Sequence, residues 1–294
     1  MSAFFYNSTM ISKEEWLGFL SKIRKNKPLN SKKKAKELLK NALIMAIKKE
    51  ATDKRFGILF SGGIDSSLIA FISKKLGLKF NCYCVGLKDA EDIVFAEKAA
   101  KKLKINLKKK ILTKKEIEND LKWLAKLVPE FDTIKAGVGC VTYEGLKLVR
   151  KSGIKVIFTG LGSEEVFAGY KRHLNSNDVN EECWKGLETM YERDFIRDFV
   201  IAEKLGIALR TPFLDEEVIK IGMSMPAEWK IDKKIPDRNK LILREIAIEL
   251  GLPKEIAFRK KRAAQYGSKI DKVIEKLAKE NGFKNKINYL KSLK

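Results

Sequence analysis

Residues 61–67, with the sequence SGGIDSS, combine two adjacent glycines, three serines and one aspartate. The segment follows the apolar residues 56–60 and precedes a second apolar run at 68–71. Adjacent glycines let the backbone turn sharply with its N–H groups pointing outward, and a helix that begins there adds a partial positive charge. Serine hydroxyls add donors, so the segment is suited to bind pyrophosphate. Asp65 would repel phosphate unless a cation lay between them, and we therefore interpret it as a Mg²⁺ ligand.

The same residues also fit a simpler structure, a turn in which Asp65 or a serine caps the following helix. A P-loop is excluded because no lysine follows the last glycine. The order S-G-G-x-D-S-S behind an apolar strand is more specific than glycines and serines alone. We therefore favour the phosphate site.

The elements around this segment alternate between strand and helix. We expect strands at 56–60, 79–85, 106–111 and 153–158, and helices at 66–76 and 91–103. In the second half, residues 180–205, 214–225, 238–250 and 268–280 have helical patterns. The alternation predicts an α/β fold, a doubly wound parallel sheet with a mostly helical C-terminal half. Ligands bind at the carboxyl ends of such strands, where residues 61–67 lie.

The chain of 294 residues predicts one large domain or two smaller ones. Residues 31–50 have apolar side chains at helical spacing, and a shorter apolar helix precedes them. We expect a helical leader at 1–50 and the nucleotide domain at 51–294.

The composition limits the classes of partner. The formal net charge is +23, from 61 Lys and Arg against 38 Asp and Glu. Because the lysines are spread over helical faces with few aromatics, we favour a solvated exterior, although a nucleic-acid surface remains possible. No apolar run approaches the ~18 residues of a membrane span and no signal peptide is evident, so we expect a cytoplasmic protein without a membrane partner.

The cysteines and the single histidine carry no recognisable catalytic pattern. Cys82, Cys84, Cys140 and Cys183 form no CxxC pair, and we expect buried thiols rather than metal or redox chemistry. With His173 as the only histidine, a structural role is favoured for it.

Other segments carry a family resemblance. Residues 61–67 resemble the pyrophosphate loop of the N-type ATP pyrophosphatases, and residues 158–173, FTGLGSEEVFAGYKRH, resemble the S-G-E-G-S-D-E-x-F-G-G-Y segment of asparagine synthetases. Four more segments also resemble that family: FDTIKAG (131–137), ALRTPFLDEEVIKIGMSMP (208–226), DRNKLILREIA (237–247) and LPKEIAFRKKRAAQYGS (252–268). The chain is identified as a member of the asparagine synthetase synthetase-domain family. The resemblance implies a sheet of the adenine nucleotide alpha hydrolase-like (PP-loop) type.

The resemblance also implies an activity, a ligase of asparagine biosynthesis. Such an enzyme uses ATP and Mg²⁺ to adenylate a carboxylate, by default aspartate, releases pyrophosphate, and forms an amide with ammonia or another amine. Asp65 and Glu164 would bind Mg²⁺, and Lys240 would stabilise charge on the α-phosphate. The implied ATP site is Leu59, Ser61, Gly62, Gly63, Asp65, Ser66, Ser67, Val85, Thr159 and Gly160. The implied substrate-binding residues are Lys135, Glu165, Arg210 and Gln265. Arg210 could instead pair only with Asp215.

Two departures from the family leave the substrates open. Leu161 stands where asparagine synthetases have glutamate, and a leucine cannot act as an acid or base in amide formation. The chain begins Met1–Ser2 rather than with a nucleophilic cysteine, so we expect no glutaminase domain and a need for free ammonia, another amine or a separate glutaminase subunit.

Two other functions remain as alternatives. The first is a PP-loop enzyme that adenylates a base in tRNA, against which the missing CxxC pairs argue. The second is a non-catalytic ATP-binding subunit of a synthetase complex.

Overall fold

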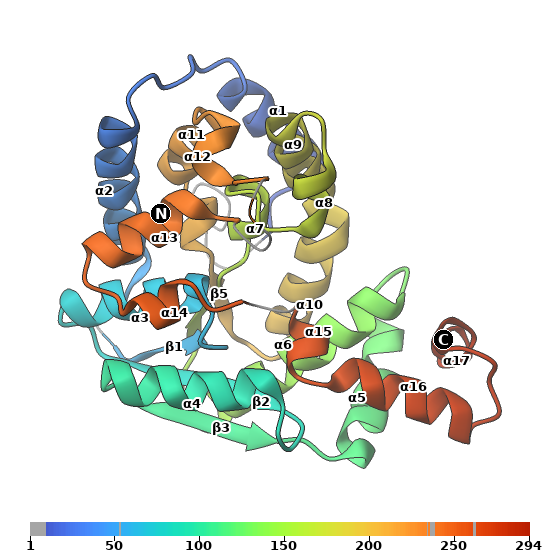
Figure 1. The fold of residues 1–294 in the computed structure, drawn as a ribbon. Coiled ribbons are helices and arrows are strands. Elements are labelled where there is room, and N and C mark those ends of the chain that lie inside the picture. The colour runs from blue at the N-terminus through green and yellow to red at the C-terminus, as the bar shows by residue number, and fades with distance from the viewer. Residues whose placement is uncertain (1–9, 53, 234, 236–238, 261–262) are drawn as a thin grey trace.

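The computed structural model describes residues 10–52, 54–233, 235, 239–260 and 263–294. Its centre is a five-stranded parallel sheet in the order β3-β2-β1-β4-β5 (Figure 1). The strands are β1 Phe56–Leu59, β2 Phe80–Gly86, β3 Leu107–Ile111, β4 Val156–Phe158 and β5 Ala208–Arg210. The predicted doubly wound parallel sheet is confirmed.

Helices make up most of the remaining described residues. The α-helices are α1 Lys13–Ile23, α2 Lys32–Glu50, α3 Ile64–Lys75, α4 Glu91–Leu103, α5 Lys114–Leu127, α6 Thr133–Lys151, α7 Ser163–Val166, α8 Lys171–Asn175, α9 Val179–Met190, α10 Ile196–Lys204, α11 Glu216–Met223, α12 Ala227–Lys230, α13 Leu241–Glu249, α14 Lys254–Ala257, α15 Ala264–Gly267, α16 Ile270–Glu280 and α17 Lys286–Lys291. The short elements η2 Tyr191–Phe195 and η3 Pro212–Leu214 are a π-helix and a 3₁₀ turn.

Strand β1 lies at the point where the sheet order reverses. It pairs in parallel with β2 on one side and with β4 on the other, and the strands that follow these two in the chain, β3 and β5, lie at opposite edges of the sheet. This reversal opens a crevice at the carboxyl ends of the strands of doubly wound sheets. The β1–α3 connection, residues 60–63, therefore lies where such folds bind ligands.

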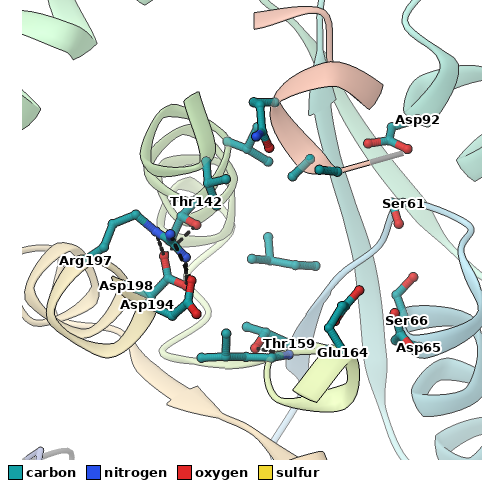
Figure 2. A pocket seen from close by; sticks show the side chains of 18 of the residues that line it. Ser61, Asp65, Ser66, Asp92, Thr142, Thr159, Glu164, Asp194, Arg197 and Asp198 are labelled. Carbon is teal, nitrogen blue, oxygen red and sulfur yellow. Dashed lines mark hydrogen bonds and ion pairs between the residues drawn. The ribbon is translucent and has the colours of Figure 1, made fainter. Parts of the chain in front are cut away.

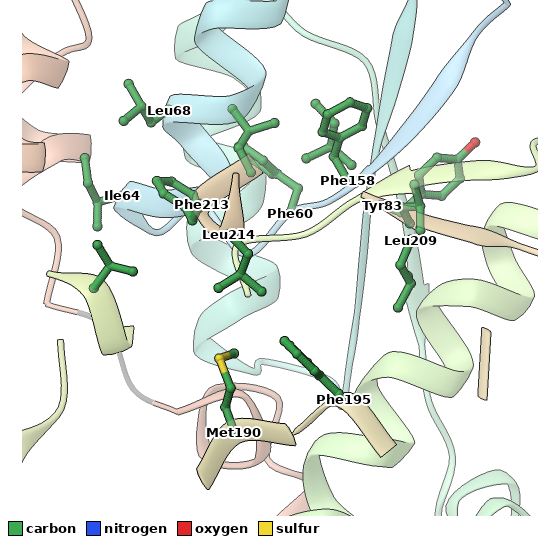
Figure 3. Packing of buried hydrophobic residues seen from close by; sticks show 14 of the residues in the cluster. Phe60, Ile64, Leu68, Tyr83, Phe158, Met190, Phe195, Leu209, Phe213 and Leu214 are labelled. Atoms are coloured by element: carbon green, nitrogen blue, oxygen red, sulfur yellow. The ribbon is translucent and has the colours of Figure 1, made fainter. Parts of the chain in front are cut away.

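The core beneath this connection is apolar and continuous. Figure 3 shows side chains from α3, the strands and the later helices packed together. Those labelled are Phe60, Ile64, Leu68, Tyr83, Phe158, Met190, Phe195, Leu209, Phe213 and Leu214, and all are buried. This packing holds the start of α3 against the sheet.

The N-terminal helices share that core. Trp16 of α1 is fully buried, donates its indole N–H to the carbonyl oxygen of Leu187 at 2.8 Å, and packs edge-on against Phe195 with ring centroids 5.1 Å apart. Helix α2 packs against α11 and η3. The two helices thus stabilise the sheet domain that follows them, and an independent 51–294 domain stays a prediction.

The second half departs from expectation at two places. Strand β5 was not predicted, because its three residues are too few for an alternating pattern and it is defined by its pairing with β4. The helix expected at 180–205 is α9, the π-turn η2 and α10 in succession. The π-turn carries Arg193 and Asp194, which face the cavity described below.

The expected burial of the cysteines is confirmed. All four cysteines are buried and free, and burial raises the pKa of the Cys82 and Cys84 thiols well above its usual range. Among the described residues, no helix has both the length and the apolar content of a bilayer span.

Candidate active site

The loop between β1 and α3 is held tightly against a neighbouring helix. Gly62 has φ +71°, the left-handed region that favours glycine, and a Cβ added there would lie 2.7 Å from the carbonyl oxygen of Phe95 in α4. Gly63 is the N-cap of α3. The side chains of Asp65, Ser66 and Ser67 follow in the buried first turn of that helix. The helix N-terminus and its polar first turn thus form one wall of the site.

Lys240 brings its ammonium group to this wall from 175 residues further along the chain. Its Nζ lies 2.7 Å from Asp65 Oδ1, 2.7 Å from Ser163 Oγ and 3.0 Å from Glu164 Oε1. Lys240 is 3% exposed and Asp65 is 2% exposed. Three residues proposed as catalytic or metal-binding from sequence are therefore brought together, and Ser163 joins them.

The backbone around Lys240 is braced by its neighbours in the NKLILRE segment. Lys240 is the N-cap of α13 and has φ +54°, uncommon for a residue other than glycine. Arg244 donates to the carbonyl oxygen of Asn239 at 2.7 Å and to its side-chain oxygen at 3.1 Å. Asn239 in turn donates to the carbonyl oxygen of Gly169. Sequence reasoning missed Asn239 and Arg244, although both lie in the segment that pointed to Lys240.

The carboxylates of Asp65 and Glu164 suit a divalent cation. They converge on one positive charge, since both hold the ammonium of Lys240. Carboxylate oxygens are the ligands that Mg²⁺ prefers, and Mg²⁺ in nucleotide sites takes one or two carboxylates and completes its shell with phosphate oxygens and water. Among the described residues, no cluster of three or more metal-ligating side chains occurs. The two residues could therefore hold Mg²⁺ together with a bound nucleotide.

A cavity of about 510 Å³ opens beside this group (Figure 2). Figure 2 shows Ser61, Asp65 and Ser66 on one side and Asp194 and Arg197 across from them. Of the residues predicted from sequence, those in the cavity wall are Leu59, Ser61, Asp65, Ser66, Val85, Thr159, Gly160, Glu164 and Gln265. Gly62, Gly63, Ser67 and Lys240 adjoin the described wall without lining it. The cavity has the size of a small-ligand site.

The wall far from the loop is built from a buried network of charges that sequence reasoning missed. Arg197 is 2% exposed and binds Asp198 through two nitrogens, each at 2.8 Å, and Asp194 at 3.1 Å. Thr142 of α6 donates to Asp198 at 3.0 Å. Because both acids neutralise Arg197, this wall is polar without being strongly cationic.

Glu165 lies behind the cavity rather than in its described wall. It accepts a hydrogen bond from the Tyr170 hydroxyl at 2.8 Å and pairs with Arg193 at 2.5 Å. Burial, and next the charge of Asp194, raises the pKa of Glu165 to about 7. Glu165 therefore orients two side chains, Tyr170 and Arg193, that do face the cavity.

Lys135 and Arg210 are not brought to the described cavity wall. Lys135 is buried at the start of α6, where its Nζ donates to the carbonyl oxygen of Pro129 at 3.3 Å and lies 3.5 Å from Glu130. Arg210 ends β5 and donates to the carbonyl oxygen of Leu209 at 3.4 Å. Their roles in binding substrate stay predictions.

Asp215 and His173 have structural contacts. Asp215 pairs with Lys49 at 3.3 Å and caps α11 by accepting the N–H of Glu217. His173 is buried, its Nδ1 accepts the backbone N–H of Tyr170 at 3.0 Å, and burial lowers its pKa to about 4. These contacts agree with the structural role expected for His173, which stays a prediction.

Arg259 ties the C-terminal segment to the loop. Its guanidinium donates to the carbonyl oxygen of Ser61 and to Asp92 at 2.8 Å, and it stacks over the ring of Phe95 at 4.0 Å. Sequence reasoning quoted the segment 252–268 but did not select Arg259 or Asp92. Arg259 is the first arginine of that segment, and this position was the available signal.

The fold and the site together define a doubly wound α/β protein with a glycine- and serine-rich loop at the switch point of its sheet. The family model described as asparagine synthase matches residues 34–184 and 175–286, so the chain belongs to this family.

Relatives with curated names agree. The chain is 35% identical over 292 residues to "Putative asparagine synthetase (glutamine-hydrolyzing) 1" of Methanocaldococcus jannaschii, a match that covers 87% of this chain and 54% of that protein. It is 27% identical to "Asparagine synthetase (glutamine-hydrolyzing) 3" of Arabidopsis thaliana, over 73% of this chain and 40% of that protein. The chain thus spans about half the length of the curated relatives it matches. Among solved structures, the NMN synthetase of Francisella tularensis superposes with a TM-score of 0.43 and 15% identity, over 90% of this chain and 94% of that one.

Proposed function

We propose that this protein is an ATP-dependent, AMP-forming ligase that adenylates a carboxylate and converts it to an amide. The observation that carries the proposal is the convergence of Lys240, Asp65 and Glu164 beside the N-terminus of α3. A helix N-terminus suits phosphate, two carboxylates suit a divalent cation, and a lysine supplies positive charge where negative charge develops. Membership of the asparagine synthase family supports the same reaction class.

In the first step, a carboxylate oxygen of the acid attacks the α-phosphorus of ATP, and the bond from that phosphorus to the β-phosphate bridging oxygen breaks. Pyrophosphate leaves, and the N-terminus of α3 with Ser61 and Ser66 holds it. Mg²⁺ on Asp65 and Glu164 would neutralise charge on the phosphates. Lys240 stabilises the additional charge on the α-phosphate.

In the second step, an amine nitrogen attacks the acyl carbon, AMP leaves, and the amine gives up a proton. Leu161 lies in the cavity wall and cannot take that proton. The nitrogen donor is ammonia or another amine, and a separate glutaminase subunit is one source that we propose for it.

The acid is proposed to be aspartate in the first instance, because the relatives' names give asparagine, the amide of aspartate, as what they make. A second carboxylate on the substrate would meet arginines that already have acidic partners: Arg172 pairs with Glu182 at 2.9 Å, and Arg197 with Asp198 at 2.8 Å. This pairing, with Leu161, leaves room for a different acid. The experiment below therefore tests other acids as well as aspartate.

The test is Mg²⁺-dependent exchange of [³²P]pyrophosphate into ATP, with aspartate and other amino acids and metabolic acids added one at a time. We expect exchange with at least one acid, and we expect Lys240→Ala to reduce it by about 10²- to 10³-fold, the loss typical of removing one charge-stabilising group. Lys220→Ala serves as the control, since the ion pairs of Lys220 among the described residues are with Glu216 and Glu217 of its own helix.

Exchange that requires an acid other than aspartate would support the proposed reaction and identify a different substrate. No exchange with any small acid, together with ATP turnover on addition of tRNA, would replace the proposal by the RNA-modifying alternative. Nucleotide binding without exchange under any condition would favour a non-catalytic subunit.

A further inference from the structure

The ammonium of Lys240 lies where a metal ion would be expected. It is surrounded by Asp65 Oδ1, Ser163 Oγ and Glu164 Oε1 at 2.7, 2.7 and 3.0 Å. A lysine ammonium has three donors and no acceptor, so three oxygen contacts use its full capacity. In this arrangement Lys240 cannot also donate to a phosphate without giving up one of its partners.

The two carboxylates are engaged as well. Glu164 has one oxygen on Lys240 and the other within 3.2 Å of the Ser163 hydroxyl. Mg²⁺ binds its oxygen ligands at about 2.0–2.1 Å and tolerates little distortion. An ammonium and a divalent cation that shared the same carboxylate oxygens would also repel each other strongly in a buried site.

The position of the lysine stem limits how it can give way. A Cβ at Gly169 would lie 2.4 Å from Lys240 Cε and 2.9 Å from the Cα of Glu164, so the stem lies in a narrow slot against that glycine. Lys240 therefore has no room to retreat toward Gly169. Asp65 and Glu164 line the cavity, whereas Lys240 does not, so the cavity side is the open direction.

We propose that Lys240 is an internal counter-ion: without nucleotide its ammonium occupies the cation position between Asp65 and Glu164, and it would move toward the phosphates when these carboxylates hold Mg²⁺. This rests on the proposed function, because it assigns Mg²⁺ and ATP to the site. It adds an order of events: the protein without nucleotide binds the metal weakly, and the group that stabilises the α-phosphate is released only when the metal is in place.

The experiment measures the affinity of the whole protein, without nucleotide, for Mn²⁺, which is a spectroscopic substitute for Mg²⁺. Free Mn²⁺ is followed by its electron paramagnetic resonance signal during titration. We expect Lys240→Met, which keeps the length of the side chain and removes the charge, to bind Mn²⁺ at least tenfold more tightly than the wild type. Equal or weaker binding by a folded Lys240→Met protein would overturn the proposal.

Lys230→Met is the matched control. Lys230 is also a fully buried lysine, but its Nζ contacts Met223 Sδ at 3.8 Å rather than a carboxylate. We expect no change in Mn²⁺ affinity for this variant. A gain equal to that of Lys240→Met would overturn the proposal, since it would show a general effect of removing a buried charge.

Ser163→Ala keeps the proposal testable if Lys240→Met does not fold. It removes one of the three oxygens that hold Lys240 and leaves both carboxylates intact. We expect a two- to fivefold gain in Mn²⁺ affinity, whereas a loss would identify Ser163 as a metal ligand and overturn the proposal. None of these titrations depends on turnover, so they test the counter-ion separately from the ligase activity. If the wild type exchanges pyrophosphate but neither Lys240→Met nor Ser163→Ala gains Mn²⁺ affinity, the counter-ion proposal is refuted and the proposed function is not. If both variants gain Mn²⁺ affinity but the wild type exchanges no pyrophosphate with any acid, the proposed ligase function is refuted and the counter-ion proposal is not.

Discussion

Glu50 is a carboxylate that ends α2 inside the protein. It is 5% exposed, and among the described residues neither of its side-chain oxygens has a hydrogen-bond donor. Burial raises its pKa to about 7, the charge of Arg210 opposes that rise, and the charge of Asp215 adds to it. An acid whose pKa is higher in the folded protein stabilises the fold fully below its unfolded pKa, and this contribution is lost as the pH rises through the folded value. For Glu50 the loss falls between about pH 4.5 and pH 7.

Glu50→Gln should remove this dependence, because an amide does not ionise. We expect the free energy of unfolding of the variant, relative to the wild type, to rise by about 1–3 kcal/mol between pH 5 and pH 8. Urea unfolding at several pH values measures it. Glu37→Gln, an exposed site on the same helix, is the control. Parallel curves for Glu50→Gln and the wild type would show that Glu50 stays ionised in the fold.

At the scale of elements, the site depends on how closely α4 approaches the loop after β1. The backbone of Phe95 leaves no space for a side chain at Gly62, and Arg259 joins the loop, α4 and the C-terminal segment. The loop amides that we propose to hold pyrophosphate are thus held in position from two sides. Disturbing either contact should affect nucleotide binding before it affects the fold.

Gly62→Ala tests this contact, because the protein contains a matched control. Gly62 and Gly77 have nearly the same backbone, φ +71° and +69°, but a Cβ at Gly77 would meet nothing within 4 Å. Both substitutions should cost about 1 kcal/mol of stability from backbone strain, and Gly62→Ala should cost more because its Cβ meets the Phe95 backbone. Only Gly62→Ala should also weaken Mg²⁺-ATP binding, by at least about tenfold, or ~1.4 kcal/mol. Isothermal titration calorimetry measures the affinity for Mg²⁺-ATP. Equal affinities of Gly62→Ala and Gly77→Ala would show that the approach of α4 to the loop does not matter for nucleotide binding.

At the scale of the whole molecule, the N-terminal helices are part of the fold that carries the site. The indole of Trp16 reaches α9 and the π-turn η2, the element that supplies Arg193 and Asp194 to the cavity. Helix α2 is joined to α13, the helix that begins after Lys240, by an ion pair of Lys32 with Glu245 at 2.6 Å. Both sides of the site therefore rest on residues that the sequence suggested were a leader.

Trp16→Ala is expected to lower the free energy of unfolding by about 3–5 kcal/mol, the usual cost of removing a large buried aromatic side chain. Leu17→Ala, on the same helix at a position 36% exposed, should cost less than about 1 kcal/mol. Denaturant unfolding followed by circular dichroism measures both. If Trp16→Ala cost no more than Leu17→Ala, helix α1 would not be part of the cooperative fold.

The sequence alone determined the features that are local. Residues 61–67 predicted a turn into a helix that is suited to phosphate, because glycines, serines and a helix start act over a few residues. The parallel sheet followed from short apolar strands separated by helices, and α4 was predicted with the bounds it has, Glu91–Leu103. Lys240 and Glu164 were selected only through a family resemblance, since one lysine among many has no local mark of chemistry.

Tertiary structure decided what depends on distant parts of the chain. Strand β5 exists because β4 offers it a hydrogen-bonding edge, and its three residues carry no period of their own. The charge network around Arg197 had no sequence signal, because its members act on partners that only the chain path brings near. Asn239 and Arg259 lie in segments that the sequence singled out, but their roles depend on distant partners, Gly169 and Ser61, that the sequence does not show. The same holds for Lys240, because a sequence shows that a charge is present, while burial and the approach of Asp65 and Glu164 determine what that charge neutralises.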